Sequence, residues 1–317
     1  MTEFGYWLSS EEHLPLDLVR DTARAEELGF GFAMISDHFH PWIDAQGQSP
    51  FVWSVLGGIA QATERIELAT GVTCPLIRTH PAIVAHAAAT VGAMLPGRFT
   101  LGLGTGENLN EHVTGARWPA PDERIEMLEE AIEVIRLLWQ GGEQTHRGRH
   151  YTVDHATLYT LPEQPIPIAV AAAKPRAAEL AGRLGDALVN TAPDEEIVSA
   201  YREAGGAGLL YGMVRLCWAE DEEEATETAF RLWRHTGLDG TVNQELPRPS
   251  DFDAVAESVT KEMATGSLPC GPDPEPVLAE IRKWQEAGFD RIALHQVGPD
   301  QDGFFRFWEQ ELQPALS

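Results

Sequence analysis

The strongest constraint on the fold is a regular alternation of short apolar segments with longer segments that have helical apolar spacing. Eight strands that alternate with helices are typical of an α/β protein whose parallel sheet closes into a (β/α)8 TIM barrel. We therefore expect a single domain over residues 1–317. An open, doubly wound sheet is the alternative, but no GxGxxG motif follows the first strand. The predicted strands cover residues 4–9, 31–38, 66–74, a run from residue 99, 166–173, 187–191, 211–219 and 291–297.

Two segments break the alternation and are predicted to be insertions into the barrel. Residues 145–161 indicate two short strands on the surface. Residues 237–269 are irregular and polar, with Pro247 and Pro249, and they are too long for an ordinary connection. We expect this second segment to be a functional loop with some helix of its own.

The composition excludes some classes of protein. A net charge of −26 argues against nucleic-acid binding, because neutralising phosphates needs a basic face. No apolar run approaches the roughly 20 residues of a membrane helix, and the N-terminus reads as a strand rather than as a secretory signal. The three cysteines are too widely spaced for a disulfide framework or a zinc pattern. We expect a cytoplasmic protein that binds a small molecule, with no membrane partner.

Polar residues at the ends of the predicted strands are the candidates for an active site, because barrels place their sites there. The second strand ends with Asp37, His38, His40 and Trp42. His38 could act as a general base near neutral pH, or it could be a core histidine held by Asp37. No third ligand accompanies the two histidines, so we expect no metal site. The other candidates are Thr73, Cys74, Thr105, Glu107, Asn110, Lys174, Asn190, Thr191, His295 and Gln296.

Residues 99–111 combine an apolar strand with a glycine-rich turn. Gly102, Gly104 and Gly106 fall at every second position and therefore share one face. Their missing side chains could leave room for a flat ligand, or they could serve a tight turn that needs positive φ. Glu107 follows directly, where partial desolvation would suit proton donation.

Two motifs identify a family resemblance. Residues 36–42 read Ser-Asp-His-Phe-His-Pro-Trp, and residues 104–111 read Gly-Thr-Gly-Glu-Asn-Leu-Asn-Glu. With further matches at residues 78–85, 181–186 and 288–295, the chain resembles the luciferase-like flavin and deazaflavin oxidoreductases of the bacterial luciferase superfamily. Within them it is most similar to the coenzyme F420-dependent glucose-6-phosphate dehydrogenase family. The resemblance implies an F420-dependent dehydrogenase or reductase that acts on the CH–OH group of an alcohol or sugar-type substrate.

The resemblance also implies roles for single residues. His38 would take the proton of the substrate hydroxyl, Glu107 would protonate the coenzyme, and Trp42 would lie beside the developing intermediate. A non-proline cis peptide bond is implied between Gly71 and Val72, beneath the coenzyme ring. The residues implied in coenzyme binding are Asp37, Gly71, Val72, Cys74, Thr105, Gly106, Asn110, Ala173 and Lys174.

The chain departs from this family where a sugar phosphate would bind. Asp194 stands where the family has a phosphate-binding lysine after the sixth strand, and only Lys261 lies near the second expected lysine. A carboxylate repels a phosphate by on the order of 1–4 kcal/mol near a surface. Glucose 6-phosphate is therefore a doubtful substrate, and a neutral alcohol or a different sugar is favoured.

Beside the F420-dependent enzyme, two other functions are considered, and the resemblance also implies an oligomeric state. Residues 46–53 and 295–298 are similar to relatives that use FMN, so an FMN-dependent reductase or monooxygenase is the alternative enzyme. A coenzyme carrier without chemistry is a third possibility, which the presence of both His38 and Glu107 argues against. Family members are commonly dimers, and we expect a homodimer that uses the helix at residues 81–95 and the helix before it.

The acidic composition predicts a salt-dependent stability. Only Lys174, Lys261 and Lys283 are lysines, and strong acidity with so few lysines is typical of proteins from a salt-rich cytoplasm. Because salt screens self-repulsion, we expect the melting temperature to rise when KCl is raised from about 0.1 to about 2 M. Calorimetry in matched KCl and sucrose solutions measures this. A melting temperature that does not change with KCl would contradict the prediction.

Overall fold

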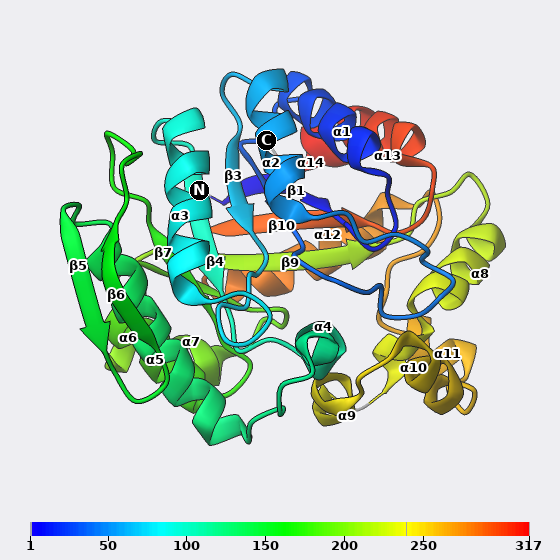
Figure 1. The fold of residues 1–317 in the computed structure, drawn as a ribbon. Helices are drawn as coiled ribbons and strands as arrows, with labels where there is room; N and C mark the ends of the chain where they lie inside the picture. The colour runs from blue at the N-terminus through cyan, green and yellow to red at the C-terminus, as the bar shows by residue number, and fades with distance from the viewer. Residues whose placement is uncertain (1, 239, 317) are drawn as a thin grey trace.

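The computed structural model describes residues 2–238 and 240–316, and its central feature is a closed parallel barrel (Figure 1). The strands follow one another around the barrel in the order β1-β10-β9-β8-β7-β4-β3-β2. The (β/α)8 TIM barrel expected from the sequence is thereby confirmed. Its strands are β1 Glu3–Leu8, β2 Phe32–Ile35, β3 Glu67–Thr70, β4 Phe99–Leu103, β7 Ile168–Ala171, β8 Ala187–Val189, β9 Leu210–Leu216 and β10 Arg291–Gln296.

Helices cover the outside of the barrel, and their first residues explain where they begin. Proline occupies the first turn of α1, α3, α5, α6 and α12, where its missing N–H has no helical partner to lose. Aspartate side chains cap α7, α8, α12 and α13. The helices are α1 Pro15–Glu27, α2 Val52–Ala62, α3 Pro81–Met94, α4 Asn108–Glu111, α5 Pro121–Leu138, α6 Pro175–Leu184, α7 Glu195–Glu203, α8 Glu222–Trp233, α12 Pro274–Glu286, α13 Gln301–Phe307 and α14 Gln313–Leu316.

Both predicted insertions are present. The first is an antiparallel hairpin of β5 (Glu143–Arg147) and β6 (Thr152–Thr157), as expected. The second is largely helical rather than irregular, with α9 Gly240–Glu245, α10 Pro249–Ala256 and α11 Lys261–Thr265. Helices of five to eight residues make at most about two turns, so they show little of the periodicity by which helices are predicted.

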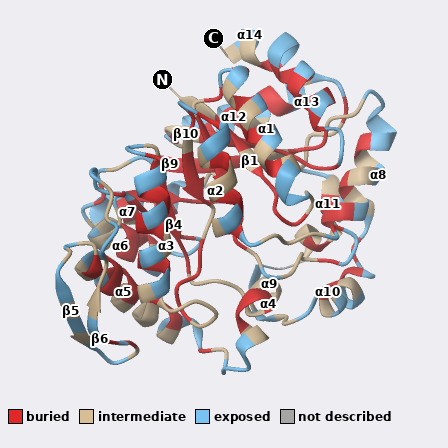
Figure 2. Ribbon diagram, turned by 45° about the horizontal axis from the view of Figure 1, so that its top comes forward, coloured by how far each residue is buried: buried red, intermediate tan, exposed pale blue. Residues whose placement is uncertain are grey.

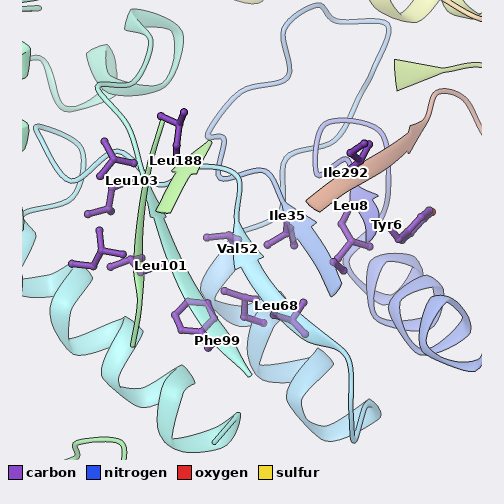
Figure 3. Packing of buried hydrophobic residues seen from close by; sticks show 14 of the residues in the cluster. Tyr6, Leu8, Ile35, Val52, Leu68, Phe99, Leu101, Leu103, Leu188 and Ile292 are labelled. Atoms are coloured by element: carbon purple, nitrogen blue, oxygen red, sulfur yellow. The ribbon is translucent and has the colours of Figure 1, made fainter. Parts of the chain in front are cut away.

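The core of the barrel has two parts, one inside the lumen and one between the strands and the outer helices. Figure 2 shows the strands largely buried, while the outer helices also carry exposed residues. On β2, Phe32 and Met34 face the lumen while Ala33 and Ile35 face the helices. Figure 3 shows Ile35, Leu68 and Leu101 in the outer part. At the carboxyl end of the lumen, the apolar floor is only partly buried, and it consists of Trp7, Val72 and Ala171.

The alternate glycines of β4 pack against the chain itself. A Cβ built on Gly102 would lie 1.8 Å from the carbonyl oxygen of Thr70, and one on Gly104 would lie 2.6 Å from Cγ2 of Val72. Of the two alternatives, room for a flat ligand is therefore wrong for both glycines, because the end of β3 and the Val72 side chain after it fill the space. The tight-turn alternative holds at Gly106, whose φ is +70°.

None of the helices within residues 2–238 and 240–316 is both long enough and apolar enough to span a membrane.

The close approach of β3 and β4 at Gly102 predicts that alanine lowers stability there, whereas alanine at an open glycine in a helix should raise it. Gly102→Ala should lower the free energy of unfolding by on the order of 1–3 kcal/mol, because backbone atoms cannot move aside as a flexible side chain can. Gly57 lies within α2, and no atom lies within 4 Å of an added Cβ. Gly57→Ala should raise stability by about 0.5–1 kcal/mol, since alanine is the better helix former. Urea unfolding of both variants measures this, and equal effects would contradict the packing argument.

Candidate active site

Asp37 anchors the carboxyl end of β2. Its side chain is buried, and each carboxylate oxygen has its own donor. Thr73 Oγ1 donates to Oδ2 over 2.8 Å, and Arg78 Nη2 donates to Oδ1 over 2.9 Å. The loops that follow β2 and β3 are therefore tied together at the mouth of the barrel.

Arg78 also contacts a second buried carboxylate, Glu111. Nε of Arg78 lies 3.5 Å from Oε1 of Glu111, and the backbone N–H groups of Ile77 and Arg78 donate to Oε2. Burial raises the pKa of Glu111, while the hydrogen bonds and charge of Arg78 oppose that rise. The sequence analysis assigned no role to either residue.

His38 has a defined tautomer. Its Nδ1 lies 3.2 Å from the carbonyl oxygen of His40 and 3.3 Å from Oε1 of Glu11. Both atoms are acceptors, so a neutral His38 ring carries its hydrogen on Nδ1 and has its lone pair on Nε2, the arrangement that a general base needs. Glu11 is buried and is held in place by the hydroxyl groups of Ser9 and Ser36.

Glu11 was missed by the sequence analysis. It lies in the polar connection after β1, where only its neighbours in space distinguish it from other acidic loop residues. The one available signal is that Ser9 and Ser36 both end predicted strands at the same edge of the barrel. Their hydroxyl groups converge on Oε2 of Glu11 at 3.1 and 2.7 Å.

Asn110 joins the two proposed proton carriers. Its Oδ1 accepts from the backbone N–H groups of Phe39 and His40 at 2.9 and 3.2 Å. Its Nδ2 lies 3.4 Å from Oε2 of Glu107. Glu107 is half-buried and stands directly before α4. The structure thus brings the two sequence motifs together, as the sequence analysis expected.

Trp42 packs against the second insertion. Its ring stacks on His235 with a centroid distance of 5.1 Å, and it meets the edge of Phe252 at 5.5 Å. His38 lies 5.1 Å from the same indole. The helices α9 and α10 therefore cover this side of the mouth, and Asn108 at the start of α4 donates to Glu245 in α9 (Figure 1).

The remaining candidates are distributed along one arc of the mouth. The Gly71–Val72 peptide bond is cis, as the resemblance implied. Cys74 is buried beneath Gly106, and burial raises the pKa of its thiol well above the ordinary value, so it acts as a small apolar side chain. Thr105 is half-buried. Ala173 and Lys174 lie exposed at the start of α6.

The candidates at the ends of β8 and β10 lie outside this arc. His295 is fully buried and stacks on Trp7 at 5.9 Å, while Gln296 accepts from the backbone N–H of Trp218. Asn190 accepts from the backbone N–H groups of Thr191 and Ala192. Among the described residues, no group of three or more His, Cys, Asp or Glu side chains could hold a metal ion.

These features place His38, Glu107 and a partly covered apolar floor together at the mouth of a closed barrel. The sequence profile of the luciferase-like monooxygenase family matches residues 1–291, and the chain belongs to that family. It is 34% identical to the F420-dependent glucose-6-phosphate dehydrogenase of Microbacterium testaceum, covering 99% of this chain and 97% of that protein. The enzyme of the same name from Nocardia farcinica is 33% identical, covering 99% of this chain and 98% of that protein.

Solved structures give a consistent result. An F420-dependent secondary alcohol dehydrogenase in complex with an F420-acetone adduct has a TM-score of 0.91 and 32% identity, covering 100% of this chain and 99% of that one. The coenzyme F420-dependent tetrahydromethanopterin reductase of Methanopyrus kandleri has a TM-score of 0.78 at 22% identity, with coverage of 100% and 99%, so it shares the fold.

Proposed function

We propose that this protein is an oxidoreductase that transfers a hydride between coenzyme F420 and the CH–OH group of an alcohol or sugar-type substrate. The observation that carries the proposal is His38, whose Nδ1 is held by two acceptors and whose Nε2 is free to take a proton. The names of the similar proteins support the choice of coenzyme. FMN chemistry, the alternative from the sequence, has no comparable support.

The apolar floor at the mouth supports the binding of a flat ring. Val72 and Ala171 form part of an apolar floor that the protein leaves only partly covered. Such a floor loses contact with water when an aromatic ring lies on it. Lys174 is exposed at the start of α6, where a cation suits the anionic tail of the coenzyme. The residues proposed to hold the coenzyme are Asp37, Gly71, Val72, Cys74, Thr105, Gly106, Asn110, Ala173 and Lys174.

Coenzyme F420, when bound, supplies the carbon atom that accepts or releases the hydride. His38 Nε2 takes the proton of the substrate hydroxyl, and the Glu11 carboxylate stabilises the imidazolium that forms. In this direction the carboxyl group of Glu107 would give the proton that the coenzyme ring takes up together with the hydride, and in the reverse direction it would receive that proton. Trp42 and the helices behind it exclude water from the reacting atoms.

We propose that the substrate is not a phosphorylated sugar. Asp194 caps α7 by accepting hydrogen bonds from the backbone N–H groups of Glu196 and Ile197. The carboxylate at this position therefore has a structural role. Lys261 forms an ion pair with Glu227 on α8. Neither position offers a free cation to a phosphate.

We also propose a cytoplasmic homodimer. Phe51 directly precedes α2, and Ile83 lies in the first turn of the neighbouring α3; they are 60% and 58% exposed. Exposed apolar side chains on adjacent helices support an interface between two copies. Three free cysteines are typical of a reducing compartment.

Coenzyme binding tests the proposal directly. Purified protein should quench the fluorescence of coenzyme F420 and should show no binding of FMN at the same concentrations. Titration followed by fluorescence gives both dissociation constants. Tight FMN binding with none for coenzyme F420 would overturn the proposal in favour of a flavin enzyme.

A second prediction concerns His38. His38→Ala should lower the turnover number by about 10²–10⁴-fold, because it removes the general base. Binding of coenzyme F420 should persist, since the substituted side chain is proposed to face the substrate. His86→Ala changes an exposed histidine on α3 and is the matched control. Unchanged turnover in the His38 variant, measured by the absorbance of coenzyme F420, would exclude His38 as the base.

A further inference from the structure

Arg215 occupies a distinctive place at the mouth. Side chains of a strand alternate between its two faces, so Arg215 shares the lumen face of β9 with Tyr211 and Met213. It pairs with His295 in the register between β9 and β10. Around the closed barrel, β9 lies four strands from β3 in either direction, directly across from Gly71 and Val72. Arg215 therefore stands on the wall opposite the proposed coenzyme site.

The guanidinium of Arg215 is held from two sides and open on a third. Its Nε donates to Nδ1 of His295 over 3.3 Å, and its central carbon lies 4.2 Å from the centroid of the Trp233 ring. An arginine has five N–H donors, of which four belong to the terminal nitrogens. Within the described part of the chain, these four find no acceptor and no ion pair. The terminal nitrogens are not fully enclosed, so an acceptor can reach them.

The two carboxylates nearest in the mouth are already engaged by other donors. Glu12 accepts from Trp233 Nε1 and from the backbone N–H of Gly298, each at 2.8 Å, and it lies 3.4 Å from Nε2 of His295.

Glu11 is occupied in the same way by Ser9, Ser36 and His38. Neither carboxylate makes the two-pronged contact that an arginine fork prefers.

Other buried arginines of this chain do reach an acid. Arg78 contacts Asp37 and Glu111, and Arg291 contacts Glu3 and Glu67. Arg215 is the exception among these, and it lies on the lumen face of β9.

Arg215 is charged and is linked to His38 through side chains that lie between β9 and β2. Burial lowers the pKa of Arg215 to about 10, with the charges of Glu12 and Glu11 opposing that fall, so it stays protonated at neutral pH. Glu11 touches His38 and also acts on the charge of Arg215.

His235 contacts Trp233, on which Arg215 lies. It also stacks on Trp42, which contacts His38. Burial and the charges of Arg215 and His38 lower the pKa of His235, so it stays neutral. Arg215 and the proposed base are therefore joined by a continuous set of side chains at the mouth.

We propose that Arg215 binds a carboxylate of the substrate, so that the CH–OH compounds oxidised here are hydroxy acids. The proposal rests on the proposed function and names its substrate class. A single planar fork matches one carboxylate, which accepts two parallel hydrogen bonds from the terminal nitrogens. A phosphate dianion is less suitable, because the charges of Glu11 and Glu12 act on Arg215 and Lys261 is already paired with Glu227.

Calorimetry without coenzyme tests the binding step by itself. Acetoacetate, the carboxylated ketone that corresponds to 3-hydroxybutyrate, should bind the wild-type protein, and 2-butanone is the neutral comparison. Arg215→Gln should weaken acetoacetate binding by about tenfold or more, since a charge-assisted pair is lost. Arg24→Gln removes an exposed charge on α1 and should leave this binding unchanged. Equal affinity for acetoacetate in the wild type and in Arg215→Gln overturns the proposal.

Kinetics with coenzyme F420 test the substrate class. The wild type should have a higher kcat/KM for 3-hydroxybutyrate or lactate than for 2-butanol or glucose 6-phosphate. Arg215→Gln should reduce the hydroxy-acid kcat/KM at least tenfold more than that for 2-butanol, and Arg215→Lys should restore part of the preference. If Arg215 has only a structural role, Arg215→Gln should lower kcat/KM equally for all substrates, and that outcome contradicts the proposal.

The two proposals fail in different ways. If no alcohol reduces coenzyme F420, the proposed function fails, and calorimetry still decides whether Arg215 holds a carboxylate. If neutral alcohols are turned over as well as hydroxy acids by the wild type, the proposed function stands and the role of Arg215 is wrong. This wild-type comparison also decides the matter if Arg215→Gln does not fold.

Discussion

The arrangement of the mouth depends on one buried cation. Arg78 bonds Asp37 at the end of β2 and lies against Glu111 in α4, although it comes itself from the connection after β3. Removing one member of such a group leaves buried charge without a counter-charge, at a cost of about 3–5 kcal/mol. Three connections are therefore fixed relative to one another by a single guanidinium. The adjacent residues, His38 after Asp37 and Glu107 within the turn before Glu111, take their positions from this group.

The barrel was predictable because its signals are local. A parallel strand that is buried on both faces is a short, continuous apolar run, and proline or aspartate marks the start of most of the outer helices. The second insertion was predicted less well. Its helices bury a few residues such as Phe252 and Ala264, and these gain their partners only when α8 and Trp42 are in place. Nothing in the polar sequence of that segment indicates those partners in advance.

The residues of the site also divide into those that local sequence could indicate and those that it could not. His38, Trp42 and Glu107 could be proposed from the sequence because each follows an apolar strand, where polar side chains are unexpected in a core. Glu11 could not, since its burial arises from serines 2 and 25 residues away. The glycines of β4 show a further limit. Spacing by two places them on one face, but only the closed barrel shows that this face meets Thr70 and Val72.

The same geometry makes the two proposed proton carriers parts of one rigid unit. The backbone of Phe39 and His40 donates to Asn110, and Asn110 in turn contacts Glu107. His38 is fixed from the other side by the His40 carbonyl and by Glu11. Proton and hydride transfers lose rate steeply when donor and acceptor are displaced, so short links through the backbone suit this chemistry better than long, free side chains. Because backbone links on the β2 and β4 side set the proposed base and acid, the opposite wall is free to vary. A substrate-binding role for Arg215 on that wall would not require the reacting groups to move.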